Sequence, residues 1–263
     1  MRWPVFGMMA WLGMFAGSAA AHFNMLLPQT ASAKKGETLT LTYQWGHPFE
    51  HQLFDAPEPV RVVVWAPDGK RSDLTKSLVK TTVPAAEGKK ATAYQLKFIL
   101  EQRGDYVFLL QTPPIFMEED GEFLQDIVKV VVHVQAQKGW DAAVPGQFEI
   151  MPLTRPYGLQ SGMVFQGLIE ARDLIPSKPF AGALIEVERY NSAPPKQLPP
   201  DEQITRTVKT DPNGVFTTTL PEAGWWCLTA KRDAGTRQRE GKNYPVRQRA
   251  TLWVYVDEKN SGK

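Results

Sequence analysis

The sequence contains one cysteine, Cys227, among its 263 residues, so no disulfide can form within the chain. Net charge is also low, because 30 Lys and Arg residues face 28 Asp and Glu residues, which leaves +2. This near balance gives no support for a nucleic-acid partner. The sequence signatures of serine hydrolases, zinc proteases, phosphate-binding loops and dinucleotide-binding folds are missing too. We therefore expect a protein that is not an enzyme and is held together by core packing alone.

Long apolar runs are confined to the start of the chain. Residues 1–21 carry a single charge, Arg2, followed by an apolar run over 5–15. Ala19 and Ala21 are the small residues that signal peptidase favours three residues and one residue before its cut. This order predicts a signal peptide over 1–21 and a periplasmic mature protein. An uncleaved membrane anchor is the alternative, because the run approaches spanning length.

Cleavage after Ala21 would make His22 the first residue of the mature protein. Its free α-amine and its imidazole Nδ1 could then close a chelate ring on a divalent metal ion. An α-amine has a pKa of roughly 8, so it loses its proton to a metal readily at neutral pH.

Short strands with Gly and Pro turns account for the chain up to residue 150, where no stretch keeps a 3.6-residue period over three turns. Alternation or β-branched residues predict strands over 38–45, 60–65, 92–100, 106–110 and 127–135. In the last of these, Val128, Val130, Val132 and Val134 share one face and His133 lies on the more polar face. The pattern predicts an Ig-like β-sandwich over 22–152.

A second set of strands is expected over 162–170, 183–190, 203–209, 215–220, 225–231 and 249–256. Residues 182–187 and 210–216 resemble the transthyretin-like, or carboxypeptidase-regulatory, type of sandwich. We predict this C-terminal sandwich over 153–257, after a proline-containing linker within 139–156, with a frayed tail over 258–263. The basic stretch 233–247 is expected to be a mobile loop. The fold class is thus all-β, with two sandwiches in tandem.

Three of the four histidines lie within 30 residues of the predicted mature start. His47 and His51 follow the predicted strand 38–45, so they lie on a loop or on the first turn of a helix, and in a helical turn their spacing of four would put both imidazoles on one side. With the amine and imidazole of His22 they would supply four nitrogens, a set that suits Ni²⁺ or Cu²⁺ and also serves Co²⁺. We predict a metal site of His22, His47 and His51.

Other residues near this predicted site have weaker claims. Glu50 could accept a hydrogen bond from an imidazole, although a surface carboxylate explains it equally well. Met25 is expected to pack rather than bind metal, and His133 to be exposed or capping. The acidic stretch 117–122 lacks the spacing of a calcium loop and is expected to be solvated.

Several stretches resemble the NikM-like family of periplasmic nickel and cobalt uptake proteins. They are residues 22–28, 47–51, 104–108, 129–132, 139–141, 152–159, 164–167 and 213–226. The resemblance implies a periplasmic protein that binds Ni²⁺ or Co²⁺ and works beside an energy-coupling-factor type membrane transporter. Relatives often carry a histidine ahead of the Lys-Val-Val run, where this chain has Asp126 as an oxygen substitute or else a weaker site.

Two other functions stay open from the sequence. The first is a copper carrier or copper oxidase in which His22 and one further histidine hold the metal. The second is an adhesion or carbohydrate-binding module in which the histidines have no role. Which metal is physiological, and whether Asp126, Glu50 or His133 joins the site, is left open by the sequence.

Overall fold

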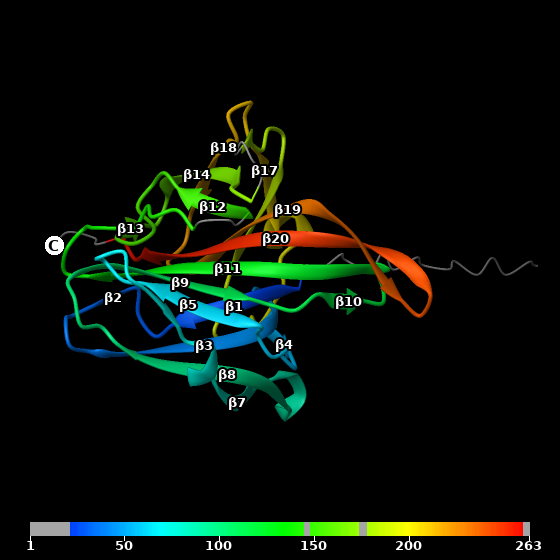
Figure 1. The fold of residues 1–263 in the computed structure, drawn as a ribbon, viewed down its shortest axis with the longest axis horizontal. Helices are drawn as coiled ribbons and strands as arrows, with labels where there is room; N and C mark the ends of the chain where they lie inside the picture. Colours follow the sequence, from blue (N-terminus) through cyan, green and yellow to red (C-terminus); the bar gives the residue numbers. More distant parts are fainter. Residues whose placement is uncertain (1–21, 145–147, 174–177, 260–263) are drawn as a thin grey trace, which may run out of the picture.

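The computed structural model describes residues 22–144, 148–173 and 178–259, and nearly all of its regular structure is β-strand (Figure 1). The predicted signal peptide, residues 1–21, lies outside the described residues, as do residues 260–263 of the predicted tail. The helical segments of the described part are single turns: η1 (Thr75–Ser77), η2 (Ala86–Gly88) and α1 (Asp201–Ile204). No helix in these described ranges reaches the length and apolarity that crossing a membrane requires. The all-β prediction is confirmed.

The first layer is a five-stranded sheet made by the first hundred residues. Its order is β1 (Phe23–Pro28), β3 (Thr38–His47), β8 (Lys90–Ile99) and β7 (Val79–Pro84), and β4 (Gln52–Phe54) pairs with the end of β3. All of these pairings are antiparallel. Thr and Leu alternate along the first half of β3, as expected for a strand that is buried on one face.

The second layer is one large sheet that receives strands from both halves of the chain. Its path runs through β17 (Arg206–Lys209), β16 (Leu184–Arg189), β19 (Gly224–Arg239), β20 (Lys242–Asp257), β11 (Glu122–Val134), β9 (Gly104–Gln111), β5 (Arg61–Trp65) and β6 (Arg71–Asp73). Three short strands attach to it: β2 (Ser32–Ala33) and β10 (Ile115–Met117) on β11, and β13 (Leu159–Gln160) on β20. The parallel pair β11–β20 joins the halves, so the two predicted sandwiches share a continuous sheet.

The third layer is a four-stranded sheet of β12 (Phe148–Pro152), β14 (Met163–Ala171), β15 (Lys178–Pro179) and β18 (Val215–Leu220). β12 pairs with β14 along its whole length, which ties residues 148–152 to the second half of the chain. The predicted boundary between residues 152 and 153 therefore falls directly at the end of a strand of this sheet.

Two hydrophobic cores fill the spaces between the three layers. The core between the first and second layers contains Leu41 of β3 and Phe108 of β9. It also contains Val128, Val130, Val132 and Val134, the four valines that were predicted to share one face of β11. Between the second and third layers lie Phe148, Phe165, Phe216, Leu252 and Val254. Each core buries large apolar side chains completely, which supplies the main favourable term for folding without disulfides.

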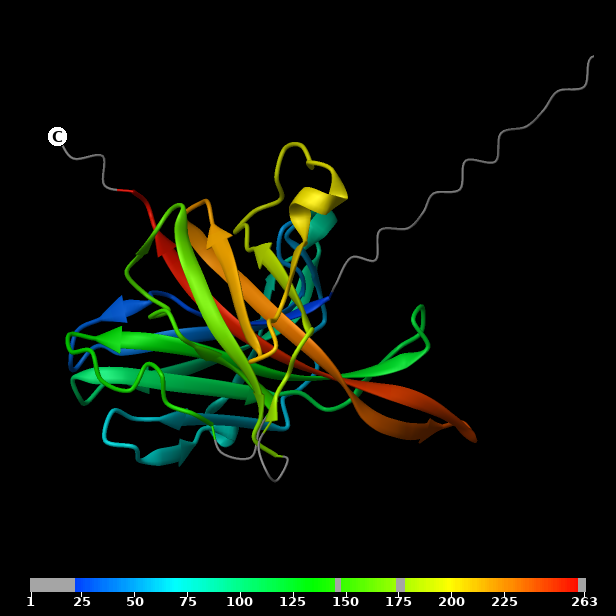
Figure 2. The same cartoon turned by 90° about the horizontal axis from the view of Figure 1, so that it is seen from above.

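The prediction of a mobile loop over 233–247 is wrong. These residues continue β19 and β20 as a long hairpin, which extends beyond the body of the molecule (Figure 2). Arg239 forms ion pairs with Glu118 and Glu240, and Arg247 pairs with Glu122 near the start of β11. Local polarity suggested a loop, but cross-strand pairing and these ion pairs with a distant segment favour strands.

Candidate functional site

The structure brings His22 and His47 together at one end of the five-stranded sheet. Phe23 lies opposite Gly46 in the antiparallel β1–β3 pair, which places His22 opposite His47 at the end of β3. Their ring centroids are 4.5 Å apart with the rings at 76° to each other. Two imidazoles that are 25 residues apart in the sequence thus form an edge-to-face pair.

Two aromatic rings complete this cluster. The Trp45 and Phe54 ring centroids each lie 5.3 Å from that of His22, and Phe54 lies 5.5 Å from His47. Phe54 reaches the cluster because β4 folds back on β3 with Trp45 opposite Phe54. The two rings therefore contribute to the burial of both imidazoles.

Gly46 allows β4 to approach β3 this closely. A Cβ atom at this position would lie 2.1 Å from the backbone oxygen of Gln52, and its φ of +150° is rarely adopted by L-residues. The β3–β4 turn, and with it the placement of His47, therefore depends on glycine at residue 46.

A buried polar network fixes β1, and hence the residue before it. The Asn24 side chain donates to Asp126 Oδ2 at 2.5 Å and accepts from the Tyr43 hydroxyl at 2.6 Å. The Trp253 indole donates to the Asn24 carbonyl at 3.1 Å. Arg249 donates to both Asp126 oxygens, at 2.7 and 2.6 Å. Both carboxylate oxygens of Asp126 thus accept hydrogen bonds from Arg249 or Asn24, so the burial of this carboxylate is explained without a metal ion.

Both imidazoles of the pair have lowered pKa values. Burial, followed by the nearby His47, lowers the pKa of His22 from 6.5 to about 4, although the charge of Asp120 opposes this. Burial also lowers the pKa of His47, against the charges of Glu50 and Glu119. The two rings are therefore neutral at pH 7, which is the form of imidazole that binds metals.

His47 Nε2 is buried and has no hydrogen-bond partner among the described residues. A buried polar atom without a partner is costly, so it calls for a physical explanation such as an ion or a ligand. His47 is itself only 9% exposed and its neighbour His22 is half-buried. The orphaned nitrogen beside a second neutral imidazole is the clearest sign of a site in the region that was predicted to bind metal.

His51 does not join this pair in the structure. Residues 48–51 form a turn, and His51 has a φ of +53°. Its Nδ1 lies 2.9 Å from the carbonyl oxygen of Asn191, and its ring contacts Tyr190 at 5.9 Å. Of the two arrangements that the sequence leaves open, the chain adopts the loop: it reverses into β4, and the spacing of four does not align His47 with His51.

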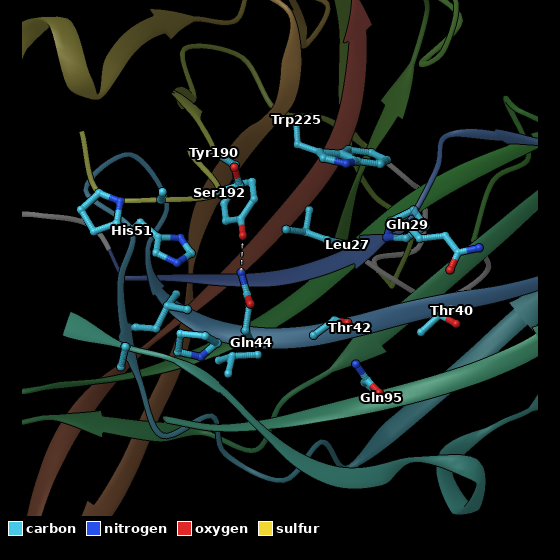
Figure 3. Close-up of a pocket in the computed structure, with 17 residues that line it drawn as sticks. Leu27, Gln29, Thr40, Thr42, Gln44, His51, Gln95, Tyr190, Ser192 and Trp225 are labelled. Atoms are coloured by element: carbon cyan, nitrogen blue, oxygen red, sulfur yellow. Dashed lines mark hydrogen bonds between the residues drawn. The ribbon is translucent and has the colours of Figure 1, made fainter. Parts of the chain in front are cut away.

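Side-chain alternation explains the separation of His51 from the pair. Gln44 and His47 are three residues apart on β3, so they point to opposite faces of the sheet. His51 lines a cleft on the face that carries Gln44, together with Tyr190 from the second half of the chain (Figure 3). The predicted set of three histidines is thus divided into a pair and a separate residue.

The other residues that were considered lie in various places. His133 Nδ1 is 2.8 Å from Asp105 Oδ1, and its ring stacks on Tyr157 at 4.3 Å, so it belongs to a different cluster. Met25 is fully buried in the first core, as expected. Glu50 contributes its charge to the surroundings of His47.

Sequence reasoning missed the rings and the acidic turn near the pair. Trp45 ends a predicted strand and Phe54 lies in no predicted element, while Glu119 and Asp120 belong to the stretch expected to be solvated and are exposed. The charges of Asp120 and Glu119 act against the lowering of the pKa values of His22 and His47, respectively. Phe54 could have been identified as a neighbour of the pair only from the register of β1, β3 and β4. The acidic turn could have been identified only from the way β10 and β11 fold.

These features define an all-β protein of three stacked sheets with a pair of imidazoles, one buried and one half-buried, at one edge. The chain belongs to the family described as a domain of unknown function, DUF4198, whose profile matches residues 19–234. No curated protein matches the chain.

Solved structures with similar strands are distant. Elastase-activated α2-macroglobulin of Escherichia coli is 12% identical with a TM-score of 0.25, over 90% of this chain and 20% of that one. A DUF4785 family protein of Legionella pneumophila is 12% identical with a TM-score of 0.27, over 80% of this chain and 52% of that one. The titin domains Z1Z2, solved in complex with telethonin, are 11% identical with a TM-score of 0.21, over 91% of this chain and 98% of that one. The chain thus spans a fifth of the macroglobulin and about half of the Legionella protein.

Proposed function

We propose that this protein is a periplasmic carrier of a divalent transition-metal ion, with His22 and His47 as its metal ligands. The observation that carries the proposal is the buried, unpartnered Nε2 of His47 beside the imidazole of His22. Cleavage after Ala21 would add the α-amine of His22 as a third nitrogen. The neutral state of both rings and the acidic charges of the 119–120 turn favour a cation there.

The cargo that we propose is Ni²⁺ or Co²⁺, delivered to a membrane transporter of the energy-coupling-factor type. This part of the proposal rests on the resemblance of the chain to nickel and cobalt uptake proteins. Imidazole and amine nitrogens suit both ions. An edge site that is half-open at His22 also allows a carrier to release its metal as well as bind it.

Copper is the second candidate, and one observation favours it. His47 accompanies His22, whereas His51 is held by Asn191 on the other face of the sheet. The amine and imidazole of His22 with one further imidazole make three nitrogens, the set expected of a copper carrier or a His-brace copper oxidase. Cu²⁺ also binds nitrogen ligands more tightly than Ni²⁺ or Co²⁺.

Metal titration of exported protein tests the proposal. The chain is expressed with its own leader, the new N-terminus is read by mass spectrometry, and Ni²⁺, Co²⁺, Cu²⁺ and Zn²⁺ are titrated calorimetrically. His47→Ala should weaken binding at least about 100-fold, since it removes one of three nitrogens, and an alanine placed ahead of His22 should do the same.

Two matched variants serve as controls. His51→Ala and His133→Gln remove an imidazole elsewhere and should change the affinity less than about threefold. A large loss with His51→Ala would refute the two-histidine site and restore the three-histidine prediction. Unchanged affinity with His47→Ala would refute the site altogether. Oxygen consumption by the copper-loaded protein with a reductant separates an oxidase from a carrier.

A further inference from the structure

A cleft of about 610 Å³ opens on the outer face of the five-stranded sheet, away from the His22–His47 pair. Residues of β3 and β8 form its floor, and the opposite side is formed by Tyr190, residues 192–194 and Trp225 (Figure 3). Its volume falls within the range of roughly 300–1,000 Å³ that is typical of small-molecule sites. The cleft therefore has the size of a ligand site that the metal proposal does not use.

The floor presents hydroxyl and amide groups. Thr40 and Thr42 alternate along β3, and Gln95 on β8 lies directly opposite Thr42. The side chains of Thr40, Thr42 and Gln95 form no hydrogen bond with another described residue, whereas the Gln44 amide donates to the Tyr190 hydroxyl at 3.1 Å. Several donors and acceptors on the floor are thus free to bind a ligand.

Aromatic side chains from the second half of the chain face this floor. Figure 3 shows Tyr190 reaching across to Gln44, with Trp225 and Leu27 on one side of it and His51 on the other. The His51 Nδ1–H donates to the Asn191 carbonyl, because a carbonyl only accepts, and this leaves a lone pair on Nε2. Half-buried rings beside polar groups are typical of sites for ligands with both apolar and hydroxyl faces.

The cleft carries no formal charge from the described residues that line it. The cleft is lined by 17 described residues, and none of them is Asp, Glu, Lys or Arg, although these four types make up 22% of the chain. A charged ligand would lose hydration there without gaining an opposite charge. The ligand is therefore expected to be neutral.

The floor also disfavours an extended peptide. β3 is paired with β1 on one side and β8 on the other, so its backbone groups are already hydrogen-bonded. A peptide could not add to the sheet there as an extra strand, since that mode requires a free edge. β8 is likewise paired on both sides, with β3 and β7, so the floor offers only side chains, in a combination of hydroxyl and amide groups that together with the facing aromatic rings binds sugar rings.

We propose that this cleft binds a neutral carbohydrate, with its hydroxyl groups on Thr42 and Gln95 and an apolar sugar face on Trp225. The proposal is independent of the metal site, because the cleft lies on the opposite face of the sheet from His47. It would make the protein a two-ligand molecule whose sugar site is formed by both halves of the chain.

Calorimetric titration of the whole exported protein in EDTA tests the sugar site without any metal. The probes are cellotriose, maltotriose and N-acetylchitotriose, with trigalacturonate as the acidic comparison. We expect saturable binding of at least one neutral trisaccharide and none of trigalacturonate. Trp225→Leu should weaken that binding about tenfold or more, and Thr42→Val about fivefold.

Thr38→Val is the matched control, since Thr38 lies on the same strand and the same face as Thr42 but outside the cleft. It should bind the sugar as the unmodified protein does, and circular dichroism with thermal melts verifies that each variant is folded. No binding of any neutral probe at about 10 mM would overturn the proposal. So would equal effects of Thr42→Val and Thr38→Val, tight binding of trigalacturonate, or binding of a proline-rich peptide in place of the sugars.

Discussion

Glu188 provides a sharp test of the physical reasoning, because it is a buried carboxyl at the junction of the two halves. It is 2% exposed, and its Oε1 accepts from the backbone N–H of Phe49 at 3.1 Å while Oε2 accepts from the Thr205 hydroxyl at 2.5 Å. Burial raises its pKa from 4.5 to about 7, and the charges of Glu50 and Glu186 act in the same direction, against the two hydrogen bonds. No cation pairs with it among the described residues.

The sign of the resulting pH dependence follows from proton linkage. Between pH 4.5 and about 7 the folded protein keeps the Glu188 proton and the unfolded chain does not. Stability from this group is therefore present at low pH and is lost as the pH rises through 7. A pKa raised from 4.5 to about 7 corresponds to about 3 kcal/mol in total, of which about 2–3 kcal/mol is lost between pH 5 and 8.

Glu188→Gln removes this titration while keeping the shape and polarity of the protonated side chain. Urea unfolding at pH 5 and pH 8 should show a small effect at pH 5 and a stabilisation at pH 8, with about 2–3 kcal/mol between the two. Glu222→Gln changes a carboxylate that is 59% exposed and should shift stability by less than about 0.5 kcal/mol at both pH values. Equal effects of Glu188→Gln at the two pH values would refute a raised pKa at this position.

Two further substitutions test the features that hold the histidine pair in place. Gly46→Ala should lower the free energy of unfolding by about 1–3 kcal/mol and weaken metal binding, because the new Cβ would meet the Gln52 oxygen at 2.1 Å. Gly36→Ala also has a positive φ but has no atom within 4 Å, so an equal loss in urea melts would exclude a steric cause. Asp126→Ala should cost about 3–5 kcal/mol, because it leaves Arg249 buried and unpaired. Adding Arg249→Met should recover part of this loss, and a cost below about 1 kcal/mol for the single variant would contradict the role of the pair.

Local patterns were enough for the fold class and for many strands. Alternation along 38–45 and the valines of 127–135 anticipated β3 and the buried face of β11, because a strand's side-chain period of two is written directly in its residues. The hairpin over 233–247 was missed, since its exposed polar residues lack that alternation and its ion pairs with Glu118 and Glu122 are distant in sequence. The shared large sheet was missed as well, because a parallel pair such as β11–β20 leaves no local turn signal.

The candidate site divides along the same line. Sequence alone determined that the histidines gather near the predicted mature start, and that His22 would expose an amine after cleavage, because both depend on residue order. Tertiary structure decided that His22 meets His47 and that His51 turns to Asn191 in the other half of the molecule. Strand register and the reversal at Gly46 settle which side chains share a face. The spacing of the histidines along the chain specifies neither the register nor the reversal.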